Sequence, residues 1–133
     1  MINFVPKGWG YERWIVNNEL YCGKELFIIK DKKLSLHYHL RKDETFWVLE
    51  GEVMLIHYDF PYLPEIAIDK AKDFGQLYKM FGHTVKHEML RNGDTFHVPV
   101  GMRHALVAKR DTRIIEFSTQ HFDEDSYRIL KGD

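Results

Sequence analysis

Two histidines separated by a single residue, His37 and His39, begin the stretch of this sequence with the clearest chemical potential. On a β-strand, residues i and i+2 project from the same face, so both imidazoles can reach one point. Glu44 follows a polar link that is long enough to turn the chain, and it could enter the same space from the next strand. His104, just past a Pro-x-Gly turn, could supply a fourth ligand. Three neutral imidazoles and one carboxylate suit a divalent metal such as iron(II), manganese, nickel, cobalt or zinc.

A purely structural role for these side chains is the alternative to metal binding. Three imidazoles and a carboxylate that face one interior point would be costly to bury without partners. A bound metal removes that cost, so metal binding is the favoured interpretation. Four protein ligands on a six-coordinate metal would leave open positions for two oxygens of a sugar, or for dioxygen and a substrate.

Several other polar residues are candidates for contacts with a substrate. Glu116 lies in an apolar segment of a predicted strand, where burial would raise the pKa of its carboxyl group, and it is the first candidate for a general base. Four more residues could approach the cavity or bind an anionic substrate, namely His57, His97, Arg103 and Lys24. For each of these four the alternative is a packed histidine or a solvated charge.

The spacing of these residues resembles two motifs of the cupin superfamily. The first motif, G-x5-H-x-H-x3,4-E-x6-G, has Asp31 in place of its first glycine and is otherwise matched by His37, His39, Glu44 and Gly51. The second motif, G-x5-P-x-G-x2-H-x3-N, has Ala108 in place of its last asparagine and is otherwise matched by Gly93, Pro99, Gly101 and His104. The resemblance implies an all-β fold, the double-stranded β-helix or cupin jelly-roll barrel.

Within that superfamily the chain resembles the mannose-6-phosphate isomerase-like, or type II, cupins. Residues 6–14 are similar to their R/K-P-W-G-x-Y opening, although Gly8 stands in place of the proline and Tyr11 comes one position early. Trp9 in this segment is better explained as a packing anchor, since a buried tryptophan contributes a large apolar area. Glu116 also aligns with a glutamate late in these proteins.

Three functions follow from the resemblance. The first is a metal-dependent isomerase of a sugar phosphate or nucleotide sugar, in which the metal acts as a Lewis acid and Glu116 moves the proton. The second is an iron(II)-dependent dioxygenase, and the third is a non-catalytic sugar-binding or regulatory cupin. Metal identity separates the first two, whereas the third predicts ligand binding that survives loss of the metal.

The elements that would position these residues are short strands separated by turns. The apolar run Leu26–Ile29 is expected to be buried on both faces. Gly51 is expected at a hairpin position that needs unusual backbone angles. Strands are predicted over residues 14–16, 26–29, 34–39, 45–49, 53–58, 85–90, 95–98, 104–108 and 113–118.

A short helical insertion is predicted between the two motifs. Apolar positions from Ile68 to Phe81 fall at helical spacing, with Asp69 as the N-cap and Gly82 as the stop. This insertion could cover one mouth of the barrel or lie in a dimer interface. The tail, residues 121–133, is expected to pack outside the barrel.

Composition and length predict one domain over residues 1–133. A net charge of -1 provides no basic field for nucleic acid. Cys22 is the single cysteine, so an internal disulfide is excluded and a reducing compartment is expected. The sequence has neither a signal-peptide pattern at Met1–Tyr11 nor a membrane-spanning segment, which predicts a cytoplasmic protein with no membrane partner. A homodimer and a small-molecule, sugar-derived substrate complete the expectations.

Overall fold

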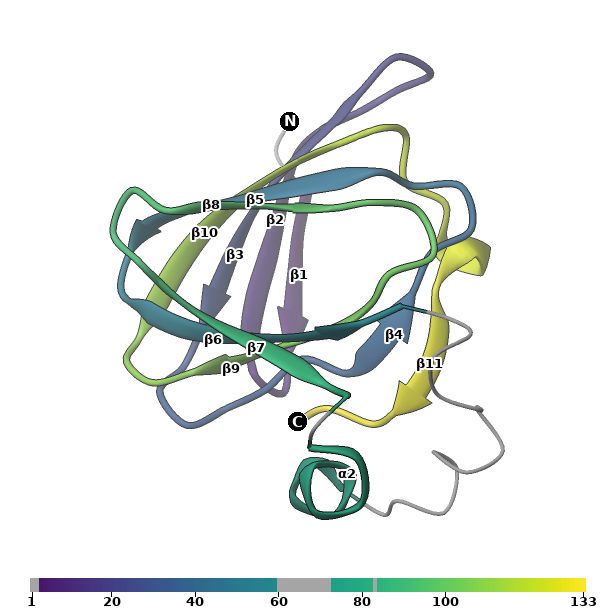
Figure 1. Ribbon diagram of the computed structural model, residues 1–133. Coiled ribbons are helices and arrows are strands. Elements are labelled where there is room, and N and C mark those ends of the chain that lie inside the picture. Colours follow the sequence, from purple (N-terminus) through teal and green to yellow (C-terminus); the bar gives the residue numbers. More distant parts are fainter. Residues whose placement is uncertain (1–2, 60–72, 83) are drawn as a thin grey trace.

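The chain folds into two antiparallel β-sheets that face each other and close into a barrel (Figure 1). The computed structural model describes residues 3–59, 73–82 and 84–133. The first sheet has the strand order β1 (Asn3–Lys7), β2 (Gly10–Asn17), β3 (Cys22–Ile28), β10 (Thr112–Ser118), β5 (Glu44–Glu50) and β8 (Thr95–Val98). The second has the order β11 (Tyr127–Leu130), β4 (Leu36–Tyr38), β9 (Arg103–Ala108), β6 (Glu52–Tyr58) and β7 (Lys86–Arg91). This arrangement confirms the predicted double-stranded β-helix.

The interior of the barrel is filled by side chains that alternate along the strands. Leu26 and Ile28 of β3 point inward, as do Val53 and Leu55 of β6, and all four are at most 2% exposed. The other buried members of this cluster are Trp9, Phe46, Val48, Leu90, Val98, Leu106, Ala108 and Ile114. Three of the cluster's residues, Leu26, Phe46 and Leu106, also line the cavity described below, so the core forms the floor of that cavity.

The expectation that Leu26–Ile29 is buried on both faces is wrong. Burial alternates along β3, and Ile29, just beyond its end, is 42% exposed. Phe27 turns outward and stacks on Tyr11 of the neighbouring strand, with ring centroids 5.3 Å apart. An antiparallel sheet can face water on one side, and here aromatic rings cover one another on that outer face, so the apolar run does not require a second layer.

The described part of the predicted helical insertion is α2 (Phe74–Phe81), which ends at Gly82 as expected. Its N-cap is Asp73, whose side chain accepts a hydrogen bond from the backbone N–H of Gln76 at 2.8 Å. The expected start at Ile68 and the expected N-cap Asp69 lie outside the described residues. In the part of the chain that the structure describes, no helix combines the length and the apolar character that crossing a membrane requires.

Helix α2 packs on the outer face of the five-stranded sheet and not over a mouth of the barrel (Figure 1). Phe74 and Leu77 join a second buried cluster with Leu36, Ile56 and Ala105. These strand residues alternate with the inward-facing ones, so they present the opposite face of the same strands. The helix therefore supports β4, β6 and β9 from outside.

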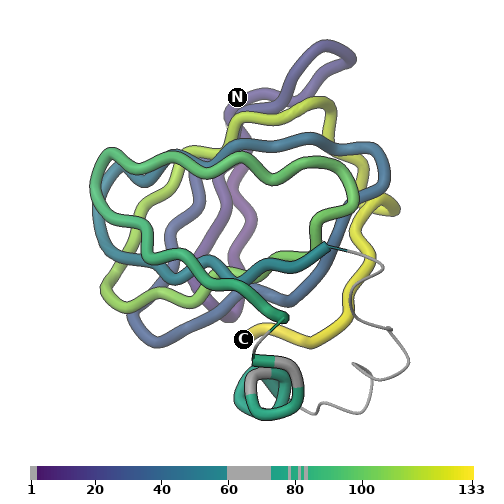
Figure 2. Tube along the Cα trace, viewed as in Figure 1, coloured from purple at the N-terminus to yellow at the C-terminus, as the bar shows by residue number. Residues whose placement is uncertain are grey.

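The C-terminal segment does not simply pack outside the barrel, as the sequence led us to expect, but adds a strand to it. A short 3-10 helix, η1 (Asp123–Asp125), leads into β11, which pairs with β4 in antiparallel fashion. Arg128 lies opposite His37 in this register, and Tyr127 lies opposite Tyr38. Figure 2 shows the yellow C-terminal segment running beside the blue β4. The pairing places the tail next to the strand that carries the first two histidines.

Candidate metal centre

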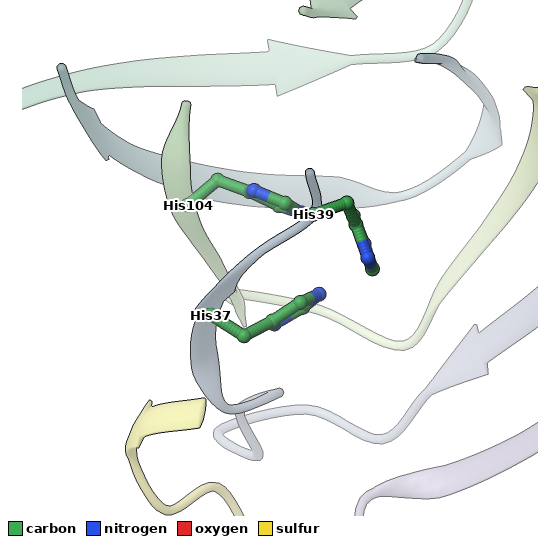
Figure 3. Close-up of side chains that lie close together, drawn as sticks. All are labelled: His37, His39 and His104. Carbon is green, nitrogen blue, oxygen red and sulfur yellow. The ribbon is translucent and has the colours of Figure 1, made fainter. Parts of the chain in front are cut away.

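Three histidines, two on the neighbouring strands β4 and β9 and one just after β4, converge on one point (Figure 3). His37 of β4 lies directly opposite His104 of β9 in the strand register, and His39 follows β4 immediately. One ring nitrogen from each residue lies within 4.8 Å of those of the other two. His39 and His104 are buried, at 4% and 1% exposure. The structure thus brings together the three imidazoles that the sequence singled out.

Glu44, the first residue of β5, reaches the same point from the opposite sheet. Its Oε1 lies 2.9 Å from Nε2 of His104 and 3.8 Å from Nε2 of His39. The side chain is 2% exposed. All four expected ligands therefore meet at the junction of the two sheets, although they come from three strands and one connection.

The backbone fixes which nitrogen of each imidazole faces the centre. Each Nδ1 lies at hydrogen-bond distance from a backbone carbonyl oxygen, which can only accept, so Nδ1 carries the proton. The acceptors are Ser35 O for His37 at 2.9 Å, Asp125 O for His39 at 2.9 Å and Met102 O for His104 at 3.0 Å. In the neutral rings each Nε2 then presents a lone pair. Hydrogen bonds of this kind on the outer nitrogen are characteristic of metal-binding histidines.

The polar atoms at the centre fit a divalent cation. Oε1 of Glu44 and Nε2 of His104 are both buried, and neither has a hydrogen-bond partner among the described residues. With the proton of His104 on Nδ1, two electron-rich atoms face each other at 2.9 Å, an arrangement that repels unless a cation lies beside both. Three imidazole nitrogens and one carboxylate are a donor set for iron, manganese, cobalt, nickel or zinc.

The protonation states at neutral pH also suit metal binding. Burial lowers the pKa of His37 well below its usual range and that of His39 to about 4, so both rings are neutral. Burial by itself would raise the pKa of Glu44, but the Lys42 ammonium is the largest opposing influence, and the pKa lies well below the usual range. His37, His39 and Glu44 are therefore in the protonation states that metal binding requires.

A cavity of about 90 Å³ adjoins the centre, and it opens beside a wider one of about 460 Å³. Both are lined by His37, Glu12 and His121, so they meet at this wall. The inner cavity also includes Glu116 and Lys24, two residues expected at the site. The space next to the histidines thus adjoins the wider cavity.

Glu116 and Lys24 face each other across β10 and β3 in the sheet register. Oε2 of Glu116 lies 2.8 Å from Nζ of Lys42, and burial together with the charge of Glu44 raises the pKa of Glu116. Nζ of Lys24 lies 3.5 Å from Oε1 of Glu12 and 4.0 Å from the centroid of the Trp14 ring. Lys24 is 3% exposed and is thus a buried, ion-paired cation.

The structure does not bring Arg103 to the cavity. It precedes His104 on β9, so its side chain projects from the outer face, where the guanidinium lies 3.7 Å from the centroid of the Tyr38 ring. There it also donates a hydrogen bond to the carbonyl oxygen of Gly101 at 2.6 Å.

The structure also leaves His97 and His57 away from the cavity wall. His97 is on the surface, 2.9 Å from Asp43, because Phe96 is the inward-facing neighbour on β8. His57 shares the inner face with His104 but contacts the ring of Phe96 at 5.0 Å and Glu88 at 3.5 Å.

Sequence reasoning missed Lys42, which is 3% exposed and lies between two carboxylates. Its Nζ is 3.2 Å from Oε2 of Glu44 and 2.8 Å from Oε2 of Glu116. Burial would lower the pKa of Lys42, but Glu116 and Glu44 raise it, so the side chain stays cationic. Its position two residues before Glu44 was the available signal, because that spacing puts both side chains on one face of an extended chain.

The comparisons with known proteins agree with this geometry. Residues 33–128 match the family model described as Cupin. The chain is 34% identical over 117 residues to a D-lyxose ketol-isomerase of Thermofilum sp. (strain ex4484_79), and the match covers 82% of this chain and 62% of that protein. The chain thus spans less than two thirds of the length of this relative.

Solved structures share the fold at low sequence identity. The capsular polysaccharide assembling protein CapF from Staphylococcus aureus superposes with a TM-score of 0.73 at 14% identity, over 98% of this chain and 34% of that one. KdgF from Halomonas sp. superposes with a TM-score of 0.66 at 14% identity, over 92% of this chain and 89% of that one. At this level of identity the likeness concerns the fold alone.

Proposed function

This chain belongs to the cupin family, and from that premise we propose that it is a metal-dependent enzyme that interconverts the aldose and ketose forms of a sugar. The observation that carries the proposal is one cavity with two kinds of wall. On one side lie three unprotonated imidazole nitrogens and the carboxylate of Glu44, and on the other lies the carboxylate of Glu116. The D-lyxose ketol-isomerase among the relatives supports the choice of a sugar substrate.

Each wall supplies one requirement of the reaction. His37, His39, Glu44 and His104 would hold the metal, which when bound acts as a Lewis acid toward the carbonyl and the neighbouring hydroxyl oxygen of the sugar. Glu116 would take the proton from the carbon next to the carbonyl and return it to the carbonyl carbon, while the hydroxyl proton passes to the former carbonyl oxygen.

Glu116 is better suited to this role than Glu12, which lines the same cavity and is not one of the proposed metal ligands. Burial and the charge of Glu44 raise the pKa of Glu116, although Lys42 opposes them, and a base works best when its pKa approaches the working pH. Burial would also raise the pKa of Glu12, but Lys24 and the N–H of Trp14, which donates to it at 2.8 Å, lower that pKa overall. Glu12 is therefore assigned to binding sugar hydroxyls, which donate to a charged carboxylate.

A phosphate or nucleotide on the sugar would extend into the wider cavity. The two buried lysines at the inner cavity, Lys24 and Lys42, are each paired with carboxylates, so their charge is already balanced. Arg128 and Lys7 line the wider cavity and provide cations there, although Nζ of Lys7 lies 3.7 Å from Oε2 of Glu12. A sugar phosphate or a nucleotide sugar would thus place its reacting end near the histidines and its anionic end near these two residues.

Metal analysis followed by an isomerase assay tests the proposal. Untagged protein would be analysed for metal by mass spectrometry, loaded separately with manganese, cobalt, nickel, zinc or iron(II), and incubated in D2O with D-lyxose, other aldoses and their phosphates. We expect ketose formation with deuterium entering the former carbonyl carbon of the aldose, which becomes C1 of the ketose, seen by proton NMR. Oxygen consumption by the iron(II) form without isomerisation would support a dioxygenase, and metal-independent sugar binding without turnover would support a binding protein.

The Glu116→Gln variant tests the assignment of the base. Loss of a general base lowers turnover by about 100- to 10,000-fold, and the metal content should remain that of the unmodified protein. Glu88→Gln is the matched control, because Glu88 is half exposed and lies outside the cavity wall. Full activity of the Glu116→Gln variant would show that another group moves the proton.

A further inference from the structure

Asp125, the last residue of η1, is 2% exposed and yet carries a carboxylate. That carboxylate accepts hydrogen bonds from the backbone N–H groups of three consecutive residues. Oδ1 accepts from Leu40 at 3.0 Å and from Arg41 at 3.1 Å, and Oδ2 accepts from Lys42 at 3.0 Å and from Arg41 at 3.3 Å. These three residues belong to the four-residue connection between His39 and Glu44, two of the expected ligands.

The same residue also contacts a ligand directly. The backbone carbonyl oxygen of Asp125 accepts the Nδ1–H of His39 at 2.9 Å. This bond fixes the tautomer in which Nε2 of His39 faces the centre. One residue from the C-terminal segment therefore orients the ring of His39 and sets the backbone path that follows it.

The connection needs such a partner because it contains no strand. Residues 39–43 lie between β4 and β5, so their N–H groups lack the regular partners that a sheet would give. Asp125 supplies acceptors for three of these groups, and the turn then delivers Lys42 and Glu44 into the interior.

Neighbouring contacts show that the C-terminal segment, from Phe122 to the end of β11, lies alongside β4 and the connection after it. Tyr127 stacks on Tyr38 with ring centroids 5.1 Å apart. The guanidinium of Arg41 lies 3.7 Å from the centroid of the Phe122 ring. Beyond η1, β11 continues this alignment by pairing with β4 (Figure 1).

From these contacts we infer that Asp125 is a positioning residue of the metal centre: it holds His39 and Glu44 at the separation that metal binding requires. The inference rests on the metal centre of the proposed function and adds a residue outside both sequence motifs. Outer-shell partners of metal ligands typically change metal affinity by about 10- to 100-fold when they are replaced.

Cobalt(II) binding by the full-length protein tests this inference. Metal-free wild type, Asp125→Asn and Asp111→Asn would be titrated with cobalt(II), with the dissociation constant measured by calorimetry and the coordination by the visible absorption of the bound ion. Asparagine at 125 keeps one oxygen but replaces the other with an amide nitrogen that cannot accept. We expect the dissociation constant of Asp125→Asn to rise by about 10- to 100-fold, with a changed absorption spectrum.

Asp111→Asn is the matched control. Asp111 also accepts a backbone N–H, that of Lys30 at 2.8 Å, but it does so in the turn that precedes β10, whereas the cavity residue Glu116 lies toward the other end of that strand. The Asp111→Asn variant should bind cobalt(II) like the wild type. A general loss of stability would leave the affinity and spectrum of the folded variants unchanged, so it would not imitate the expected result.

The outcomes separate the inference from the function on which it rests. Wild-type affinity and spectrum in Asp125→Asn would overturn the inference alone, whereas a wild-type protein that binds no metal would overturn the proposed centre as well. If Asp125→Asn fails to fold, nitrogen-15 NMR of the imidazoles in the metal-free wild type decides the matter. A proton on Nδ1 of His39 supports the inference, and a proton on Nε2 contradicts it.

Discussion

Lys42 controls the charge of the carboxylates on both sides of it. Glu44 and Glu116 share this single ammonium group, so two negative charges and one positive charge are buried together. The pKa of Glu44 is lowered, whereas that of Glu116 is raised, and a buried pair of interacting carboxyls separates in this way. In the proposed enzyme, Glu44 would thus serve as an anionic ligand, and Glu116 would remain able to exchange a proton.

At the same scale, His104→Ala should greatly reduce metal binding. His104 supplies one of the three convergent nitrogens, and its removal also takes away the ring nitrogen that lies 2.9 Å from Oε1 of Glu44. We expect less than stoichiometric metal in the purified variant, measured by mass spectrometry. His97→Ala is the control, since that imidazole lies on the surface beside Asp43. Equal metal content in both variants would show that the ligand set is wrong.

At the level of elements, the turns at the strand ends set the direction of the strands that carry the candidate ligands. Gly51, between β5 and β6, has a φ of 119°, which confirms the expected unusual backbone angle. Asp31 has a φ of 69° and stands where the first motif has glycine. Aspartate is one of the few residues that tolerates the left-handed region, so the substitution preserves the turn.

Two glycine substitutions should differ in cost because only one position is crowded. A Cβ at Gly51 would lie 2.6 Å from Oγ1 of Thr112 and 2.7 Å from the carbonyl oxygen of Asp111. At Gly93, with a φ of 86°, no heavy atom lies within 4 Å of the added carbon. We expect Gly93→Ala to cost about 1–2 kcal/mol from backbone strain alone. Gly51→Ala should cost a further 1–3 kcal/mol or so from overpacking.

Urea unfolding of the two glycine variants measures this difference in the free energy of unfolding. Both substitutions place alanine at a positive φ, so the difference reports the steric contact with Asp111 and Thr112 together with the difference in strain between a φ of 119° and one of 86°. Equal losses of stability in the two variants would contradict the expected crowding at Gly51.

At the level of the whole molecule, the metal-free protein should lose stability as the pH falls from 6.5 toward 4. Burial lowers the pKa of His39 from 6.5 to about 4, and it lowers that of His37 well below 6.5. In this window the unfolded chain binds protons that the folded protein does not, so the free energy of unfolding decreases with falling pH. His39 alone contributes a change on the order of 3 kcal/mol.

Urea unfolding in the presence of a chelator, at pH values from neutral to about 4, measures this dependence. Glu116 acts in the opposite direction, because its pKa is raised, mainly by burial, and its contribution to stability is lost as the pH rises. The Glu116→Gln variant should therefore show a steeper fall in stability on acidification than the wild type. A flat profile in both proteins would show that the imidazoles do not resist protonation in the folded state.

The sequence by itself was enough for the fold class and for the residues that converge at the centre. Both depend on local rules: strand alternation puts His37 and His39 on one face, and turn residues such as Gly51 end the strands at fixed points. The order of the motifs then placed Glu44 and His104 on strands that the barrel brings together.

Only the tertiary structure decided what surrounds those residues. Strand alternation shows which residues share a face but not which face lines the cavity. The sequence therefore could not show that Arg103 lies on the outer face, against the ring of Tyr38. Nor does local pattern reveal contacts between distant segments, so the pairing of Asp125 with the turn after His39 had no signal in the sequence. The ligands are set by short-range periodicity, whereas their orientation and charge depend on long-range packing that exists only once the sheets have formed.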